Sequence, residues 1–334
     1  MKRLFWAAAL LCLAALPASA QTYPTGPVTL VIPFAAGGPT DVLGRIVAEA
    51  MSKNLGQPVV VENVGGAGGM TGGSRVAKAK PDGQLIMIGT VGTHAQNQTL
   101  YARPQYDAIH DFTPVALIAE VPLVLLTKKT LPANSLQEFI AYAKENQAKM
   151  NYASAGNGSA VHLGCVMFNM AIGVNTTHVP YRGSGPAMND LISGQVDYFC
   201  DTVSGGVPQI QANTVKGLAY FGKTRSPALP DLPTAQEQGL KGFEAYTWNA
   251  LFLPKGTPVA QWLSVTTWVR SIFTPRASSP RFSTLPTMPT ATIATSASRL
   301  SALPATSIST ETPALSLDSF LTLAPARNVR PRFS

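Results

Sequence analysis

Short apolar runs alternate with segments of helical period along most of the chain. The runs that predict strands are rich in β-branched and other apolar residues: Val28–Ile32, Val59–Glu62, Leu85–Thr90, Leu123–Thr127, Met150–Ala153, Val196–Phe199, Gly217–Phe221 and Ala250–Leu253. The helical segments repeat apolar residues every three or four positions: Val42, Ile46, Val47, Ala50 and Met51; Leu136, Phe139, Ile140 and Ala143, with Ser135 as cap; Leu163, Val166, Met167 and Met170; and Met188, Leu191 and Ile192. Such alternation predicts an α/β fold with mostly parallel sheets.

Two glycine-rich turns each connect a predicted strand to a predicted helix. They span Pro33–Asp41 and Ala153–Ser159. The first turn of a helix has free backbone N–H groups and the positive end of the helix dipole, so both turns are predicted to bind one small anion between two lobes. The candidate ligand-binding residues are Phe34, Ala35, Gly37, Gly38, Thr40 and Asp41 in the first turn and Ser154, Gly156, Asn157, Gly158 and Ser159 in the second. Backbone N–H groups are expected to receive a carboxylate, helped by the hydroxyls of Thr40, Ser154 and Ser159.

Further polar residues are candidates for the same site: Thr93, His94, His162, Tyr181, Arg182 and Asp201. His94 follows a strand and is expected either to line a pocket or to lie in a surface loop. His162 is interpreted as a polar wall or a packed core residue. Arg182 could pair with a carboxylate or lie on the surface. Asp201 would recognise an amine or hydroxyl, or cap the helix that follows it.

The sequence lacks the motifs that mark several other kinds of binding site. The glycine run 65–73 matches neither a dinucleotide fingerprint nor a phosphate-binding P-loop, and it is interpreted as a tight turn between strand and helix. His162 and Cys165 stand three residues apart, but no further metal ligand has suitable spacing, so neither a metal nor a cofactor is expected. Most of the net charge of +8 lies in the first 20 residues and in residues 263–334, and the nearly neutral part between them argues against a nucleic-acid partner.

The N-terminal 20 residues have the pattern of a secretory signal. Lys2 and Arg3 precede an apolar stretch that ends at the cleavage motif Ala18-Ser19-Ala20, so the mature chain is expected to begin at Gln21. Export would leave two cysteines, Cys165 and Cys200. An oxidising compartment favours a disulfide between them, with two buried thiols as the alternative.

Residues 263–334 have a different composition. Lysine is absent, acidic residues are scarce, and prolines interrupt every candidate helix. This composition is typical of a disordered segment. A second interpretation is that the chain from about Trp262 is translated out of the ancestral reading frame.

Ordered motifs along the chain resemble a known family. They are Pro33-Phe34 with Gly37-Gly38, Asp41 and Arg45; Glu62-Asn63 with Gly65, Ala67-Gly68-Gly69 and Gly72; Pro81-Asp82-Gly83; Val179–Gly183; Pro186-Ala187; Gly194–Asp197; Pro230–Thr234 with Glu237 and Gly239; and Pro254–Pro258. Together they resemble the Bug family, the substrate-binding components of tripartite tricarboxylate transporters. The resemblance implies a periplasmic two-lobed Venus-flytrap protein of the periplasmic-binding-protein fold, which holds a small carboxylate for membrane permease subunits.

The resemblance also suggests a domain division. We expect a signal peptide at 1–20, a first lobe of residues 21–123 and 222–262, a second lobe of residues 124–221, and the tail at 263–334. The motifs stop after Pro258, and Ala36 stands where the family usually has proline. An exported α/β enzyme acting on a carboxylate and a ligand sensor outside transport are the alternatives, and the particular carboxylate is left open.

Overall fold

One sheet runs through the part of the chain that the computed structural model describes, residues 23–261 and Val265. The strands lie in the order β2-β1-β3-β9-β4-β7-β5-β6, and β8 pairs with β4 outside this order. Their bounds are β1 Val28–Ile32, β2 Val59–Asn63, β3 Leu85–Thr90, β4 Phe112–Lys128, β5 Asn151–Ser154, β6 Thr177–Pro180, β7 Tyr198–Thr202, β8 Val215–Tyr220 and β9 Tyr246–Pro254. The helices are α2 Pro39–Leu55, α3 Met70–Ala77, α4 Asn97–Leu100, α5 Leu136–Asn146, α6 Ala160–Ile172, α7 Ser184–Ile192 and α8 Val203–Gln211, with a 3₁₀ turn at Ala67–Gly69 and a π turn at Gly92–Gln96.

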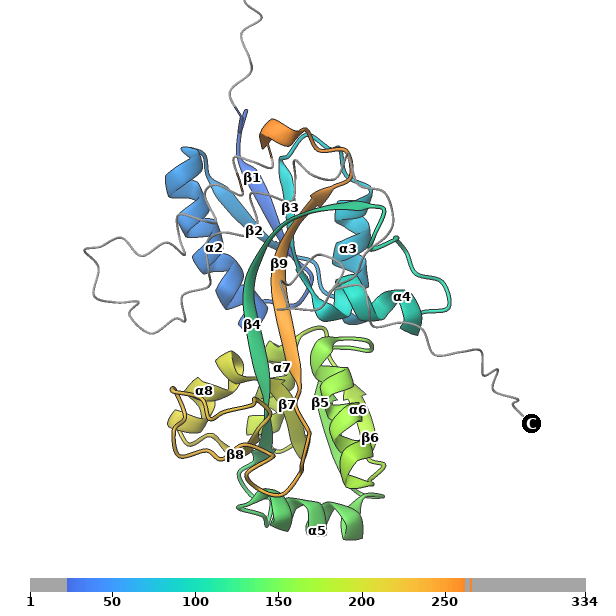
Figure 1. The fold of residues 1–334 in the computed structure, drawn as a ribbon, viewed down its shortest axis with the longest axis vertical. Helices are drawn as coiled ribbons and strands as arrows, with labels where there is room; N and C mark the ends of the chain where they lie inside the picture. The colour runs from blue at the N-terminus through green and yellow to red at the C-terminus, as the bar shows by residue number, and fades with distance from the viewer. Residues whose placement is uncertain (1–22, 262–264, 266–334) are drawn as a thin grey trace, which may run out of the picture. The chain divides into compact units, whose positions relative to one another are not determined.

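Strand β4 joins two halves of this sheet (Figure 1). Its residues 112–122 pair with β9, and its residues 123–128 pair with β7 and β8. We call residues 23–122 and 246–261 the first half and residues 123–245 the second half. The sequence pattern predicts only Leu123–Thr127 of β4, because Pro114 and Pro122 and the partly exposed positions between them hide the strand's first part.

Parallel and antiparallel pairs have separate places in the sheet. β1 pairs in parallel with β2 and β3, and β5 pairs in parallel with β6 and β7. β4 and β9 run antiparallel to each other and to their other neighbours. The βαβ alternation in the sequence therefore predicts the parallel part of each half, and the crossing strands add the antiparallel pairs.

Each half has its own buried core. In the first half, Val28, Leu30 and Ile32 of β1 pack with Met51 of α2. In the second half, Phe139, Phe168 and Phe221 pack with Tyr198. Helix α5 shows how the local sequence builds such a core. Ser135 caps the start of the helix by accepting a hydrogen bond from the backbone of Glu138, and the predicted apolar face of the helix is buried.

Residues 222–245 belong to the second half, whereas the expected domain division puts them in the first lobe. Phe243 contacts Phe168 and Phe221, with ring centroids 5.8 and 4.9 Å away, and Ala235 and Ala245 join the same core. The chain therefore returns to the first half near Tyr246, not at residue 222. Isolated aromatic residues in an irregular segment carry no periodic signal, and this explains the error.

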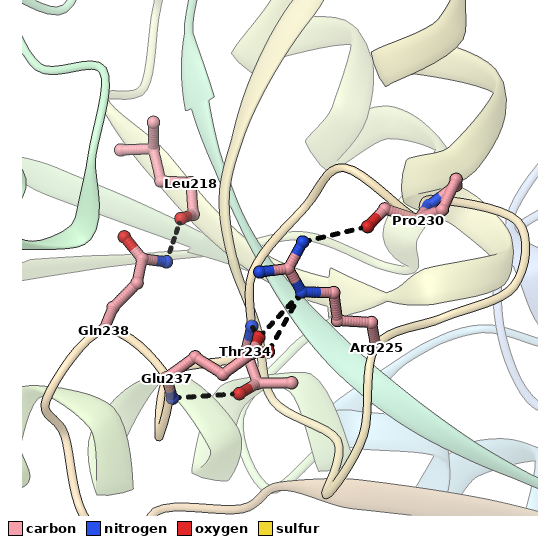
Figure 2. Close-up of polar contacts among 6 residues, drawn as sticks. All are labelled: Leu218, Arg225, Pro230, Thr234, Glu237 and Gln238. Carbon is pink, nitrogen blue, oxygen red and sulfur yellow. Dashed lines mark hydrogen bonds and ion pairs between the residues drawn. The ribbon is translucent and has the colours of Figure 1, made fainter.

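Polar contacts hold that irregular segment in place (Figure 2). Thr234 and Glu237 cap each other: the Glu237 amide donates to Thr234 Oγ1 at 3.0 Å, and the Thr234 amide donates to Glu237 Oε2 at 2.7 Å. Arg225 Nε donates to the same carboxylate, and Gln238 Nε2 donates to the Leu218 carbonyl of β8 at 2.7 Å. Tyr220 of β8 also donates its amide to the Pro233 carbonyl, so the motif Pro230–Thr234 and Gln238 together attach this segment to the sheet of the second half.

The predicted faces of two helices differ from the observed ones. In α6, Met167 and Met170 are 50% and 76% exposed, and the buried face holds Cys165, Phe168 and Ile172 instead. α6 is apolar nearly all round, so the period cannot identify its inner side. In α2, Val47 and Met51 are buried as predicted, but Val42 and Ile46 are more than half exposed.

Cys165 of α6 and Cys200 of β7 form a disulfide. Their Cα atoms lie 5.3 Å apart, and both residues are fully buried. The expected bridge is confirmed, and Cys165 is not available to share a metal with His162.

Within the described part of the chain, no helix is both long and apolar enough to cross a membrane. The expected signal peptide lies outside the described residues. So does the tail at 263–334, apart from Val265, which packs in the core of the first half.

Candidate functional site

A cavity of about 480 Å³ lies where the two predicted turns meet. We call it the central cavity. The first half contributes Phe34, Gly37, Gly38, Thr40, Asp41, Thr90, Thr247 and Asn249, among others, and the second half contributes Ala155, Ser159, Ala160, Val161, Ser184, Asp201 and Thr202. Among the described residues, no lysine, arginine or histidine lines it.

The first turn is held by the carboxylate of Asp41. Asp41 is nearly buried, and its Oδ2 accepts from the Gly37 amide and from Arg45 Nε, each at 3.0 Å. Asn63 Nδ2 donates to Asp41 Oδ1 at 2.8 Å and to the Phe34 carbonyl at 3.1 Å. Burial by itself would raise the pKa of Asp41, but the hydrogen bonds from Arg45, Gly37 and Asn63 lower it below its ordinary value. Asp41 therefore positions the turn.

Replacing Asp41 with asparagine is expected to lower the free energy of unfolding by about 2 kcal/mol at pH 7, because the charge-assisted hydrogen bonds are weakened. A lowered pKa means that this contribution is present above the ordinary value of 3.8 and is lost as the pH falls through the folded-state pKa. Urea unfolding of the wild type and the variant at pH 7 and near pH 3 measures the loss of stability and its dependence on pH. The difference between the two proteins should be clear at pH 7 and smaller near pH 3, which lies below the ordinary pKa of 3.8. An equal difference at both pH values would contradict this role.

The second turn is held by side chains of its own half. Ser154 is fully buried, and its Oγ accepts from the Gly156 amide at 3.0 Å and contacts His178 Nε2 at 2.6 Å. His162 Nδ1 accepts from the Gly158 amide at 3.2 Å, and its ring stacks on that of His178 with centroids 4.1 Å apart. Burial lowers the pKa of His162, which favours the neutral ring that can accept this bond. Ser154 and His162 therefore shape the turn from behind.

Ser159 and the residues after it face the central cavity. Ser159 is the N-cap of α6, and its Oγ accepts from the His162 amide at 3.3 Å. Gly38 and Pro39 begin α2 on the opposite side, where no side chain caps the helix. Both helix N-termini thus lie at one cavity, as the turns predicted.

The two halves contact each other through hydrogen bonds to two backbone carbonyls of the second half. The Ala35 amide donates to the Arg182 carbonyl at 2.9 Å, and Tyr101 Oη donates to the Asn157 carbonyl at 2.8 Å. A Cβ atom on Gly68, whose φ is +60°, would lie 2.0 Å from the Asn157 carbonyl oxygen. The glycine run 65–73 is a tight turn as expected, and it also lets the halves approach closely.

The predicted site residues divide into groups. Those that line the central cavity are Phe34, Gly37, Gly38, Thr40, Asp41, Ser159 and Asp201. Those that line a second hollow beside Gly65, Gly66 and Tyr101 are Gly156, Asn157, Tyr181 and Arg182. Neither hollow is lined by Ala35, Thr93, His94, Ser154, Gly158 or His162. Burial, together with the hydrogen bond that Tyr181 Oη donates to Asp190 at 2.6 Å, raises the pKa of Tyr181 to about 12.

His94 is a core residue, which corrects both interpretations of it. Its ring stacks on Phe252 with centroids 3.7 Å apart and meets the edge of Phe112. Burial lowers the pKa of His94 to about 3, so the ring is neutral. Thr93, beside it, is fully buried and bonds within the same turn to Thr90. The pairing of β9 with β3 sets Phe252 opposite Met87, and the rings of Phe252 and His94 both lie against Gly89 of β3.

Asp201 lines the cavity at the end of β7. It is nearly fully buried, and Ser184 Oγ donates to its Oδ1 at 2.9 Å. Burial raises the pKa of Asp201 to about 7, although hydrogen bonds from Thr202 and Ser184 oppose the shift. Thr202 stands at the start of α8 without a side-chain capping bond.

The motifs did not identify several residues that line the cavity: Thr90, Ser184, Thr202, Thr247 and Asn249. Thr90 and Thr202 are the last residues of strands β3 and β7. Open α/β sheets bind ligands at the carboxyl ends of their strands, so this position in the sequence could have identified both residues. Thr247 and Asn249 lie within β9, which reaches the cavity only through its long-range pairing with β4.

Comparison with known proteins identifies the family. The family model described as "Tripartite tricarboxylate transporter family receptor" matches residues 43–285. The match passes beyond Pro258, where the motifs had suggested that the resemblance stops, so that expectation is wrong. A change of reading frame near codon 262 stays a prediction, and it concerns residues outside the described part.

Solved structures agree with the family match. The periplasmic binding protein BugD is 42% identical with a TM-score of 0.74 over 76% of this chain and 85% of its own. MatC from Rhodopseudomonas palustris with bound malate is 40% identical, with a TM-score of 0.73 over 76% and 86% of the two chains. Rpa4515 of R. palustris with adipate is 38% identical, with a TM-score of 0.74 over 76% and 85%. The protein described here therefore belongs to the family of tripartite tricarboxylate transporter receptors.

Proposed function

We propose that this protein captures a small organic carboxylate in the central cavity and delivers it, unchanged, to the membrane permease subunits of a tripartite transporter. The expected signal peptide would place the mature chain, from Gln21, in the periplasm. BugD, which is 42% identical, is a periplasmic binding protein, and this supports the location.

One observation carries the proposal: two helix N-termini from different halves of the molecule lie at one cavity. α2 is 17 residues long and α6 is 13, so each has a well-developed dipole and N–H groups in its first turn that lack partners within the helix. Because no described residue with a cationic side chain lines the cavity, these backbone groups are the natural partners of an anion.

The size of the cavity fits a small ligand. About 480 Å³ lies in the range of ordinary small-molecule sites, and the lining combines apolar side chains with a few polar groups. Malate and adipate, the ligands in two related structures, are both dicarboxylates. We therefore propose a dicarboxylate skeleton of about four to six carbons as the first class to test.

The test is titration calorimetry of the full chain with succinate, glutarate and adipate, each compared with its dimethyl ester. The acids are expected to bind and the esters are not, because the esters lack the charge that the helix N-termini recognise. Mass spectrometry of the recovered ligand should return the acid unchanged, whereas a chemically altered product would support the enzyme alternative.

A pair of variants at Ala160 separates ligand binding from helix stability. Ala160 is the first residue of α6 and lines the cavity. Ala160→Asp would place a carboxylate where the ligand's is proposed to lie, so affinity should fall at least about tenfold, while an acidic residue in the first turn stabilises the helix. Ala160→Asn, which has the same shape without charge, is the control. Equal affinities of the two variants would contradict a carboxylate position at α6.

A further inference from the structure

Asp201 has one carboxylate oxygen without a hydrogen-bond partner among the described residues. Its Oδ1 accepts from Ser184 Oγ at 2.9 Å, but its Oδ2 is buried and unpaired. The residue is 1% exposed and lines the central cavity. A buried polar atom without a partner costs free energy, and native structures pair nearly all such atoms.

The described residues around Asp201 supply no positive charge to balance it. Asp41 is the other acidic residue of the lining, and it is paired with Arg45 at 3.0 Å. Among the described residues, no cationic side chain lines the cavity. A ligand that carried carboxylates alone would add more negative charge and leave Oδ2 unpaired. A ligand with a hydrogen-bond donor would satisfy this atom.

We infer that Asp201 is a specificity-determining residue that selects carboxylic acids bearing a hydroxyl or ammonium group. This inference rests on the proposed function, since the helix N-termini would hold the ligand's carboxylate while its hydroxyl or ammonium group donates to Asp201 Oδ2. Sites built to hydrogen-bond a ligand group reject an analogue that lacks it, because their own polar atoms are then left unpaired.

The experiment compares three ligands of equal carbon-chain length, in both enantiomers where they are chiral. They are a plain diacid, its 2-hydroxy derivative and its 2-amino derivative, at the chain length that binds most tightly in the panel above; for four carbons these are succinate, malate and aspartate. The hydroxylated or aminated acid is expected to bind the full chain at least about tenfold more tightly than the plain diacid.

Two variants assign that preference to Asp201. Asp201→Ala removes both oxygens, so the preference should fall to within about twofold while the plain diacid still binds. Asp201→Asn keeps the shape and one acceptor but cannot carry charge, so the preference for the amino derivative should fall more than that for the hydroxy derivative. Asp231→Asn, an exposed acidic residue away from the cavity lining, is the matched control and should keep the wild-type preference.

Equal affinities of the wild type for all three ligands would overturn the inference and leave the proposed function intact. A wild-type preference that persists in Asp201→Ala and Asp201→Asn would also overturn it. Where Asp201→Ala does not fold by circular dichroism, the isosteric Asp201→Asn decides. Failure of every carboxylate to bind would overturn both the proposed function and this inference.

Discussion

Replacing Gly68 with alanine should reduce carboxylate affinity at least about a hundredfold, roughly 3 kcal/mol. The new Cβ atom would lie 2.0 Å from the Asn157 carbonyl oxygen of the other half, and rigid backbone stands on both sides of that contact. The halves could then not approach as they do here. A ligand stabilises the closed arrangement only through its greater affinity for it, so preventing the approach removes that gain.

Gly56→Ala is the matched control for this variant. Gly56 has a similar positive φ, +66°, at the end of α2, and a Cβ atom there meets nothing within 4 Å. Both variants share the backbone strain of alanine in this region, and only Gly68→Ala adds the collision. Calorimetry measures affinity, and small-angle scattering with saturating ligand should show compaction for the wild type and Gly56→Ala alone. Normal compaction of Gly68→Ala would contradict the predicted role of this contact.

Removing the disulfide should lower the free energy of unfolding by about 3–4 kcal/mol, because Cys165 and Cys200 close a loop of 35 residues. Urea unfolding of Cys165→Ala/Cys200→Ala, compared with the oxidised wild type, measures the loss. The reduced wild type is the matched control, since it keeps both sulfur atoms and lacks only the bond.

Ligand affinity should change little in that double variant, because neither cysteine lines the central cavity. Thiol titration of the exported, denatured protein should find no free thiol at either position. Two titratable thiols, or a stability equal to that of the oxidised wild type, would contradict a stabilising bridge.

Local patterns predicted the two turns and most of the strands. Val28–Ile32 and Leu85–Thr90 agree with the structure residue by residue, since a short apolar run between turn signals has one favourable conformation in a buried sheet. Ser135 and Ser159 cap their helices because a cap depends on residues three positions away. The cavity residues Gly37, Gly38, Thr40 and Ser159 followed from this local signal.

Other features depend on contacts between distant residues. Whether Asp41 contacts ligand or supports the turn depends on Asn63 from β2 and on Arg45, and whether His94 faces a pocket depends on Phe252 from β9. Phe243 decides that residues 222–245 join the second half, and its position follows from packing on Phe168 and Phe221. Arg45 lies four positions after Asp41 on α2, which is a helical spacing, but neither Asn63, Phe252 nor Phe243 is marked by spacing or period.

The sequence by itself therefore determined the α/β class, the pair of glycine turns at helix N-termini and the family, because each is recorded in residues close together along the chain. The tertiary structure alone decided which side chains line the central cavity and how the two halves meet. It placed Thr247 and Asn249 of β9 in that lining, Gly68 against Asn157, and at the cavity Asp201, whose Oδ2 has no hydrogen-bond partner among the described residues. The physical reason is that burial and close approach are fixed by the pairing of β4 with β9 and β7, which connects residues more than 70 positions apart in the chain.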